Sequence, residues 1–137
     1  MREILFRGKR IGANRNRDGL KTGIMVYGSL FVDHKGQAKI KWYNEEYGSS
    51  ITSIVEPETV GQYTGLTDKN GKKIFEGDVV ESIFSEFKGV VVFDEYSRFM
   101  IKGLIDGRYY LLAYNNDDCE IIGNIHDNPE LLKGGDT

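Results

Sequence analysis

Hydrophobic and polar residues alternate along most of the chain in short runs, and no stretch keeps helical spacing over a useful length. β-branched and aromatic residues dominate these runs, and turn residues separate them. The pattern predicts an all-β fold, mainly an antiparallel meander that closes into a barrel or folds as a sandwich. The predicted strands are Glu3–Arg10, Ile24–Val32, Ala38–Tyr43, Ser50–Val55, Val60–Thr64, Lys72–Phe75, Val79–Phe84, Phe87–Phe93, Phe99–Ile105, Arg108–Tyr114 and Cys119–His126.

Turn signals give the second half of this meander its order. Asp68–Gly71 is the strongest, because its Asn-Gly step accepts the positive φ that hairpin turns need. Asp78 is expected to cap backbone N–H groups before the next strand begins. Asn128–Leu132 predicts one helical turn, with Asn as N-cap and Pro at the first helical position. From Glu76 onward, the order of turns and strands fits a small SH3-type barrel.

Composition agrees with a small soluble protein. A length of 137 residues allows one domain or two small lobes, and 17 glycines fit a chain with many tight turns. The single cysteine excludes an internal disulfide framework and a multi-cysteine metal site. The apolar runs are too short for a membrane span, and no apolar signal segment opens the chain, so a cytoplasmic location is expected. We expect an N-terminal β lobe over 1–56, an SH3-like barrel with its helical turn over 57–132, and a disordered tail over 133–137.

Three blocks of the sequence resemble the YopX family of phage and prophage proteins. Met1–Arg10 (MREILFRGKR) is similar to the family's start, and Pro57–Val80 (PETVGQYTGLTDKNGKKIFEGDVV) to its central signature. Ile122–Leu132 (IGNIHDNPELL) resembles its C-terminal signature, although His126 stands where the family often has Tyr. Gly12–Gly23 is also longer than the family's short turn. The resemblance implies an all-β fold with an SH3-type barrel in the C-terminal half, a phage origin and a cytoplasmic location, but no catalytic mechanism.

Candidate catalytic groups are sparse. His34 falls in a predicted turn and His126 at the end of a strand, and neither lies in a nucleophile motif. Cys119 is expected to be a buried structural thiol. Glu76 and Asp78 point the same way in an extended chain, but turn capping by Asp78 explains them better than acid–base chemistry. Phosphate-binding glycine loops are absent, so we expect a non-enzymatic protein without a cofactor.

A metal site is not predicted either. The Asp68–Gly71 turn superficially resembles a calcium loop, but its glycine comes fourth rather than sixth and no glutamate occupies the twelfth position. A hairpin turn explains these residues more simply. A weak surface cation site remains the alternative use of the acidic loop, whose carboxylates come from Asp117, Asp118, Glu120 and Asp127.

Charge is distributed unevenly along the chain. Residues 1–21 carry a net charge of +5, whereas the rest of the chain carries −8. The basic segment is interpreted in three ways: it contacts nucleic-acid phosphates, it contacts acidic patches of its own body or of a neighbouring subunit, or it is a solvated edge strand followed by a mobile loop.

Paired aromatic residues predict exposed rings. Neighbours in a strand point to opposite faces, so Trp42 and Tyr43 cannot both be core residues, and neither can Tyr109 and Tyr110. The exposed member of each pair either binds a partner or lies at the edge of the core. The candidate binding residues are Trp42, Tyr43, Tyr63, Tyr109, Tyr110, Arg7, Lys9, Arg10, Arg15 and Arg17.

Two functions are consistent with these residues. The first is a protein-interaction or self-assembling β module, expected as a homo-oligomer or as a partner of a phage or host protein. The alternative is a nucleic-acid-binding module, in which the basic N-terminal segment contacts phosphates and one aromatic face stacks bases. The acidic body counts against the alternative, and no membrane partner is expected.

Overall fold

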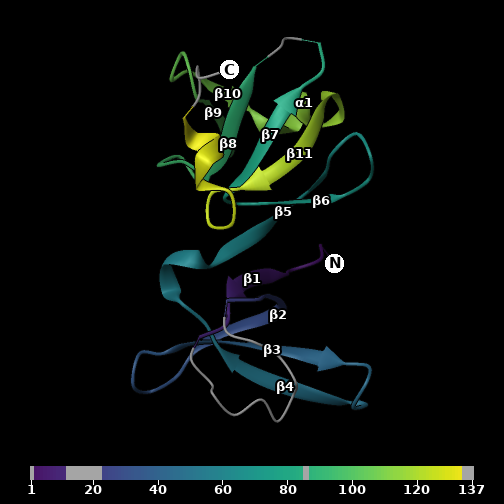
Figure 1. Cartoon of the computed structure of the whole chain (residues 1–137), viewed down its shortest axis with the longest axis vertical. Helices are drawn as coiled ribbons and strands as arrows, with labels where there is room; N and C mark the ends of the chain where they lie inside the picture. The colour runs from purple at the N-terminus through teal and green to yellow at the C-terminus, as the bar shows by residue number, and fades with distance from the viewer. Residues whose placement is uncertain (1, 12–22, 85–86, 134–137) are drawn as a thin grey trace. The chain divides into compact units, whose positions relative to one another are not determined.

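The computed structural model describes residues 2–11, 23–84 and 87–133 (Figure 1). The predicted Gly12–Gly23 loop therefore lies almost entirely outside the described residues, as do residues 134–137 of the predicted tail. Strands dominate, and each described helical segment has only three or four residues, so the prediction of an all-β fold is confirmed. No helix of the described residues is long and apolar enough to cross a membrane. The chain divides into two compact units, Met1–Gln62 and Tyr63–Thr137.

In the N-terminal unit the first four strands pair antiparallel in chain order, and the fifth strand returns to pair with the first. Its elements are β1 (Phe6–Lys9), β2 (Met25–Val32), β3 (Ala38–Asn44), β4 (Ser49–Ile54), the 3₁₀ turn η1 (Pro57–Thr59) and the first residues of β5 (Gly61–Thr67). Alternate strand residues supply its core, which consists of Val26, Ala38, Ile40 and Val55. This period of two is what the sequence pattern predicted for half-buried strands.

Strand β1 lies inside its sheet rather than at the edge. It pairs with β2 on one side and with β5 on the other, where Arg7 lies opposite Gly61. Just beyond β1, Arg10 forms an isolated antiparallel bridge with Val55. The interpretation of the basic segment as a solvated edge strand is therefore wrong for Phe6–Lys9, because both of its edges are paired.

The C-terminal unit contains a five-stranded antiparallel sheet in the order β10-β9-β8-β7-β11. Its core is formed by Ile74, Val80, Val91, Ile101, Leu112 and Cys119. The two sheets of the chain are open, so closure into a barrel is not observed. The elements are the rest of β5, β6 (Lys73–Phe75), β7 (Asp78–Ser82), β8 (Lys88–Phe93), β9 (Phe99–Gly103), β10 (Tyr109–Leu111), α1 (Leu112–Asn115), η2 (Asn116–Asp118), β11 (Cys119–Asn124) and η3 (Pro129–Leu132).

Local predictions in this unit are confirmed in part. Gly71 has a φ of +79° in the β5–β6 turn, and Asp78 Oδ2 accepts the Phe75 N–H at 2.7 Å, as capping requires. The predicted Arg108–Tyr114 strand instead ends at Leu111, and a helical turn carries the fully buried Leu112 side chain into the core. The turn at Pro129–Leu132 is present, but the Asn128 side chain accepts the Asn124 N–H instead of capping it.

Candidate functional site

The C-terminal unit carries a hollow of about 480 Å³ beside the β8–β9 turn, which we call the β8–β9 hollow. Residues from β8, the turn, β9 and β10 line it. They are Val92, Phe93, Asp94, Glu95, Tyr96, Arg98, Lys102 and Tyr109. Three of its rings are well exposed: Phe93 by 49%, Tyr96 by 70% and Tyr109 by 54%. Exposed aromatic rings around a concavity are typical of a binding surface rather than of a packed core.

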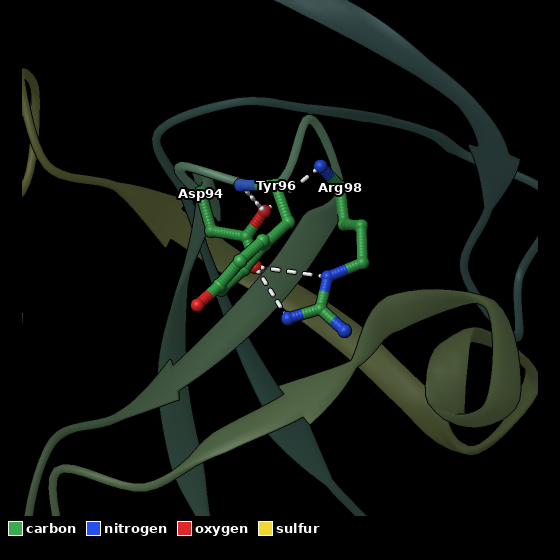
Figure 2. A network of polar contacts seen from close by, with 3 residues as sticks. All are labelled: Asp94, Tyr96 and Arg98. Carbon is green, nitrogen blue, oxygen red and sulfur yellow. Dashed lines mark hydrogen bonds and ion pairs between the residues drawn. The ribbon is translucent and has the colours of Figure 1, made fainter.

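The turn that forms one wall is organised by a single carboxylate (Figure 2). Asp94 Oδ1 accepts the backbone N–H groups of Tyr96 and Arg98 at 3.0 and 2.9 Å. Ser97 adopts a φ of +62°, a left-handed conformation that no other non-glycine residue of the described chain shares. Such a conformation persists only where surrounding contacts fix it, so the turn presents Tyr96 in a defined position.

An ion pair between the side chains of Asp94 and Arg98 also stabilises this turn. Arg98 donates to Asp94 Oδ2 from Nε at 3.0 Å and from Nη2 at 2.8 Å, and Figure 2 shows this fork. Removal from water raises the pKa of Asp94, but the hydrogen bonds from Arg98 and Tyr96 outweigh it and the pKa lies below its usual value. The guanidinium carbon of Arg98 also lies 5.1 Å from the centre of the Tyr96 ring. The charge of Arg98 is therefore used within the turn.

Strands β9 and β10 add to the lining of the hollow a cation without a carboxylate partner. Register places Tyr109 of β10 across from Lys102 of β9, and Lys102 Nζ lies 5.9 Å from the centre of the Tyr109 ring. Within the described residues, Lys102 forms no ion pair, and neither does Glu95 on the turn. The β8–β9 hollow thus combines ring faces with one available positive and one available negative group.

The predicted aromatic residues are distributed over both units, and only Tyr109 lies at the hollow. Trp42 is half-buried against the N-terminal core and donates from Nε1 to Ser53 Oγ at 3.1 Å. Tyr63 packs on Phe75, with ring centres 5.7 Å apart. Tyr43 is 61% exposed, so one ring of the 42/43 pair faces outward as predicted.

Tyr110 belongs to the edge of the core rather than to the hollow. Its ring centre lies 4.8 Å from that of Phe87, and its hydroxyl donates to Asp106 Oδ2 at 2.6 Å. This hydrogen bond lowers the pKa of Asp106 and raises the pKa of Tyr110. Since Tyr109 is exposed and Tyr110 is not, the second pair also divides between two faces as predicted.

The predicted basic residues are mostly withdrawn from the surface. Arg7 and Arg10 are only 4% and 6% exposed, and Lys9 is half-buried, with its backbone N–H donating to Thr59 Oγ1 at 2.8 Å. Arg15 and Arg17 lie outside the described residues. Burial of Arg7 follows from the interior position of β1, which the sequence pattern did not reveal.

The prediction that Cys119 is a buried thiol is confirmed. Burial raises the pKa of the Cys119 thiol to about 11, and the charges of Asp118 and Asp68 add to the effect. This thiol is fully buried and remains protonated near neutral pH, which disfavours nucleophilic reactivity. No cluster of three or more His, Cys, Asp or Glu side chains suited to a metal ion occurs within residues 2–11, 23–84 and 87–133.

Sequence analysis did not select Phe93, Arg98 or Lys102 as binding residues. One signal was present: Asp94, Tyr96 and Arg98 alternate in a short turn between two predicted strands, a spacing at which an aspartate can accept from nearby backbone N–H groups. Lys102 joins Tyr109 only through the register of β9 and β10, which the sequence does not specify.

Comparisons with known proteins give a family and a fold. A family model described as "YopX protein" matches residues 19–133. Among solved structures, the chain is similar to the crystal structure of protein EF1440 from Enterococcus faecalis, with 23% identity and a TM-score of 0.55. The similarity covers 95% of this chain and 98% of that chain, and it concerns the fold alone. No curated protein matches the chain.

Proposed function

The chain belongs to the YopX family, and on this premise we propose that it is a non-enzymatic protein-interaction module of a phage or prophage. It acts in the cytoplasm and receives a segment of a partner protein in the β8–β9 hollow. The partner is a second copy of the chain, which would give a homo-oligomer, or another phage or host protein. The observation that carries the proposal is the group of three exposed rings around the hollow beside Lys102.

The chemistry of the hollow favours a peptide segment with an apolar side chain and a neighbouring acidic residue. The apolar side chain would pack between the rings of Tyr96 and Tyr109, and the acidic group would pair with Lys102. Tyrosine is among the residues that dominate the energetics of protein interfaces. Strand β10, which contributes Tyr109, is the last strand of its sheet, so it also offers a backbone edge to an extended segment.

Two further observations bear on the proposal. The shifted pKa values favour binding over catalysis, and the strand order of the C-terminal unit fits a small barrel. The pKa shifts of Asp33, Asp68, Asp94 and Asp106 belong to turn carboxylates, and those of Tyr110 and Cys119 belong to a hydrogen-bonded hydroxyl and a buried thiol. These six shifts arise from structural contacts. The SH3-type arrangement of the C-terminal half stays a prediction. Its support is the meander from β7 to β10 with β11 returning beside β7.

We expect substitution of Tyr109 by serine to weaken binding of selected peptides about tenfold or more, because an aromatic anchor at an interface is worth more than about 1 kcal/mol. Peptides are selected on the wild-type protein from a displayed random library, and their affinities are measured by calorimetry. The enriched peptides should share an apolar residue beside an acidic one.

Tyr114 provides the matched control, because it is 84% exposed in the same unit and does not line the hollow. Tyr114→Ser should leave peptide affinity unchanged, and thermal unfolding should show that both variants fold. Equal loss in both variants, or peptides that bind Tyr109→Ser as well as the wild type, would rule out the hollow as the binding site.

A further inference from the structure

The N-terminal unit exposes a second surface, made by the residues of β2, β3 and β4 that point away from its core. Cross-strand pairs define two of its rows: Phe31, Lys39 and Ile54 lie side by side, and so do Ser29, Lys41 and Thr52. We call this surface the N-terminal sheet face. Its residues are Tyr27, Ser29, Phe31, Lys39, Lys41, Tyr43, Ser50, Thr52 and Ile54.

The aromatic rings of this face do not take part in the hydrophobic core of the unit. The alternate residues Ile40 and Trp42 pack into or against the core, which leaves Lys39, Lys41 and Tyr43 on the other side of β3. Tyr27 is 47% exposed and Phe31 42%, and Tyr43 exceeds both. Rows two residues apart on one face are separated by roughly 7 Å, so these rings occupy a platform roughly 13 Å long.

The charge on the strands is of one sign. Strands β2 to β4 contain two lysines on this face, Lys39 and Lys41, and not one aspartate or glutamate. Lys39 Nζ pairs with Asp33 Oδ2 at 3.1 Å at the end of the β2–β3 hairpin. Lys41 lies at the centre of the face and has no ion pair within the described residues.

From this juxtaposition we propose that the N-terminal sheet face binds single-stranded nucleic acid. Bases stack on Tyr43, Phe31 and Tyr27, while Lys41, helped by Lys39, contacts the phosphates. Exposed aromatic rings interleaved with cations on an antiparallel sheet are the combination that sequence-tolerant single-strand binding requires. Paired bases do not offer their faces to such rings, so duplex DNA binds more weakly.

This inference differs from a site on the basic N-terminal segment, because Arg7 and Arg10 are buried and take no part in it. It is also independent of the β8–β9 hollow, whose residues all belong to the C-terminal unit. Together the two surfaces would make the chain an adaptor, with one unit contacting nucleic acid and the other contacting protein.

Fluorescence anisotropy of labelled oligothymidine tests the inference on the full chain. We expect binding at about 50 mM salt that weakens at about 200 mM salt, because phosphate contacts release counterions. A labelled duplex of the same length should bind more weakly. Tyr43→Ala should weaken oligothymidine binding about tenfold, the loss expected for one stacked base. Lys41→Glu should weaken it further and reduce its dependence on salt.

The matched controls are Tyr109→Ala and Lys102→Glu, which make the same changes at the β8–β9 hollow and should leave oligothymidine binding intact. The inference is overturned if the wild type fails to bind at low salt, or if Tyr43→Ala and Tyr109→Ala have equal effects. It is also overturned if Tyr43→Ala and Lys41→Glu instead convert an oligomer to a monomer in sedimentation, since the face would then contact a second copy. Circular dichroism shows whether Tyr43→Ala and Lys41→Glu are folded. If one of them is unfolded, the oligothymidine affinity of the other tests the inference.

Discussion

Replacing Asp68 with alanine lowers the free energy of unfolding by about 3 kcal/mol, the largest loss we expect from a polar side chain. Asp68 is only 4% exposed, and its carboxylate ties the β5–β6 turn to β11. Oδ1 accepts the N–H groups of Asn70 and Lys72 at 2.9 and 3.0 Å, and Oδ2 accepts that of Ile121 at 3.0 Å. Alanine leaves all three donors without this acceptor. Urea unfolding of the variant measures the loss.

The conservative control is Asp68→Asn, which keeps the shape and one carbonyl oxygen. Its free energy of unfolding should fall by less than that of Asp68→Ala. The single amide oxygen can still accept from the N–H groups of the turn, but the amide has no second oxygen to accept from β11. A loss below about 1 kcal/mol in Asp68→Ala would show that the turn and β11 are held together by other contacts.

The same carboxylate sets a pH window. Burial raises the pKa of Asp68, but the N–H groups of Ile121, Lys72 and Asn70 outweigh it and hold the pKa below its usual 3.8. A lowered native pKa means that the ionised form stabilises the fold. This contribution is complete above the usual pKa and disappears as the pH falls through the lowered value. Stability measured against pH should therefore fall more steeply there in the wild type than in Asp68→Asn.

Replacing Gly28 with alanine is expected to cost about 3 kcal/mol by a different route, overpacking. A Cβ at this position would lie 2.1 Å from the backbone oxygen of Lys41 and 3.1 Å from Trp42 Cβ. Backbone cannot move away as a flexible side chain does, so β2 and β3 must separate. Chemical denaturation measures the loss of stability, and the N-terminal sheet face should be disturbed with it.

Ser29→Ala is the control for this position, because Ser29 is the exposed neighbour of Gly28 on the same strand. It should change stability by less than about 0.5 kcal/mol, as surface substitutions usually do. If Gly28→Ala is as mild as Ser29→Ala, the close approach of β2 and β3 is not required for folding.

Sequence patterns located most of the strands because a period of two survives wherever one face is buried. The Ala38–Tyr43 and Phe87–Phe93 predictions lie within one residue of β3 and β8 at each end. Arg108–Tyr114 was less accurate, because its β-prone aromatic residues give no sign that Leu112 is needed in the core. Tertiary packing overrides local propensity at such a position.

The candidate surfaces were harder to predict, since they depend on which strands become neighbours. The sequence predicted that Tyr109 or Tyr110 is exposed but not which one, and the neighbours of Tyr109 at the hollow, Lys102 and Tyr96, come from β9 and the preceding turn. Arg7 was selected as a surface cation, and pairing of β1 on both edges buried it. Alternation tells which residues share a face of one strand, whereas register between strands decides which faces become sites.

Binding of a protein segment in the β8–β9 hollow is tested by titrating the isotopically labelled full chain with a selected peptide and following the amide chemical shifts. We expect the shift changes to concentrate on the β8–β9 turn around Asp94 and Tyr96, on Lys102 and on Tyr109. Shifts concentrated on Lys41 and Tyr43 would place peptide binding on the N-terminal sheet face. Shifts elsewhere in the chain, or none at a concentration where calorimetry detects binding, would likewise contradict the claim that the β8–β9 hollow receives a protein partner.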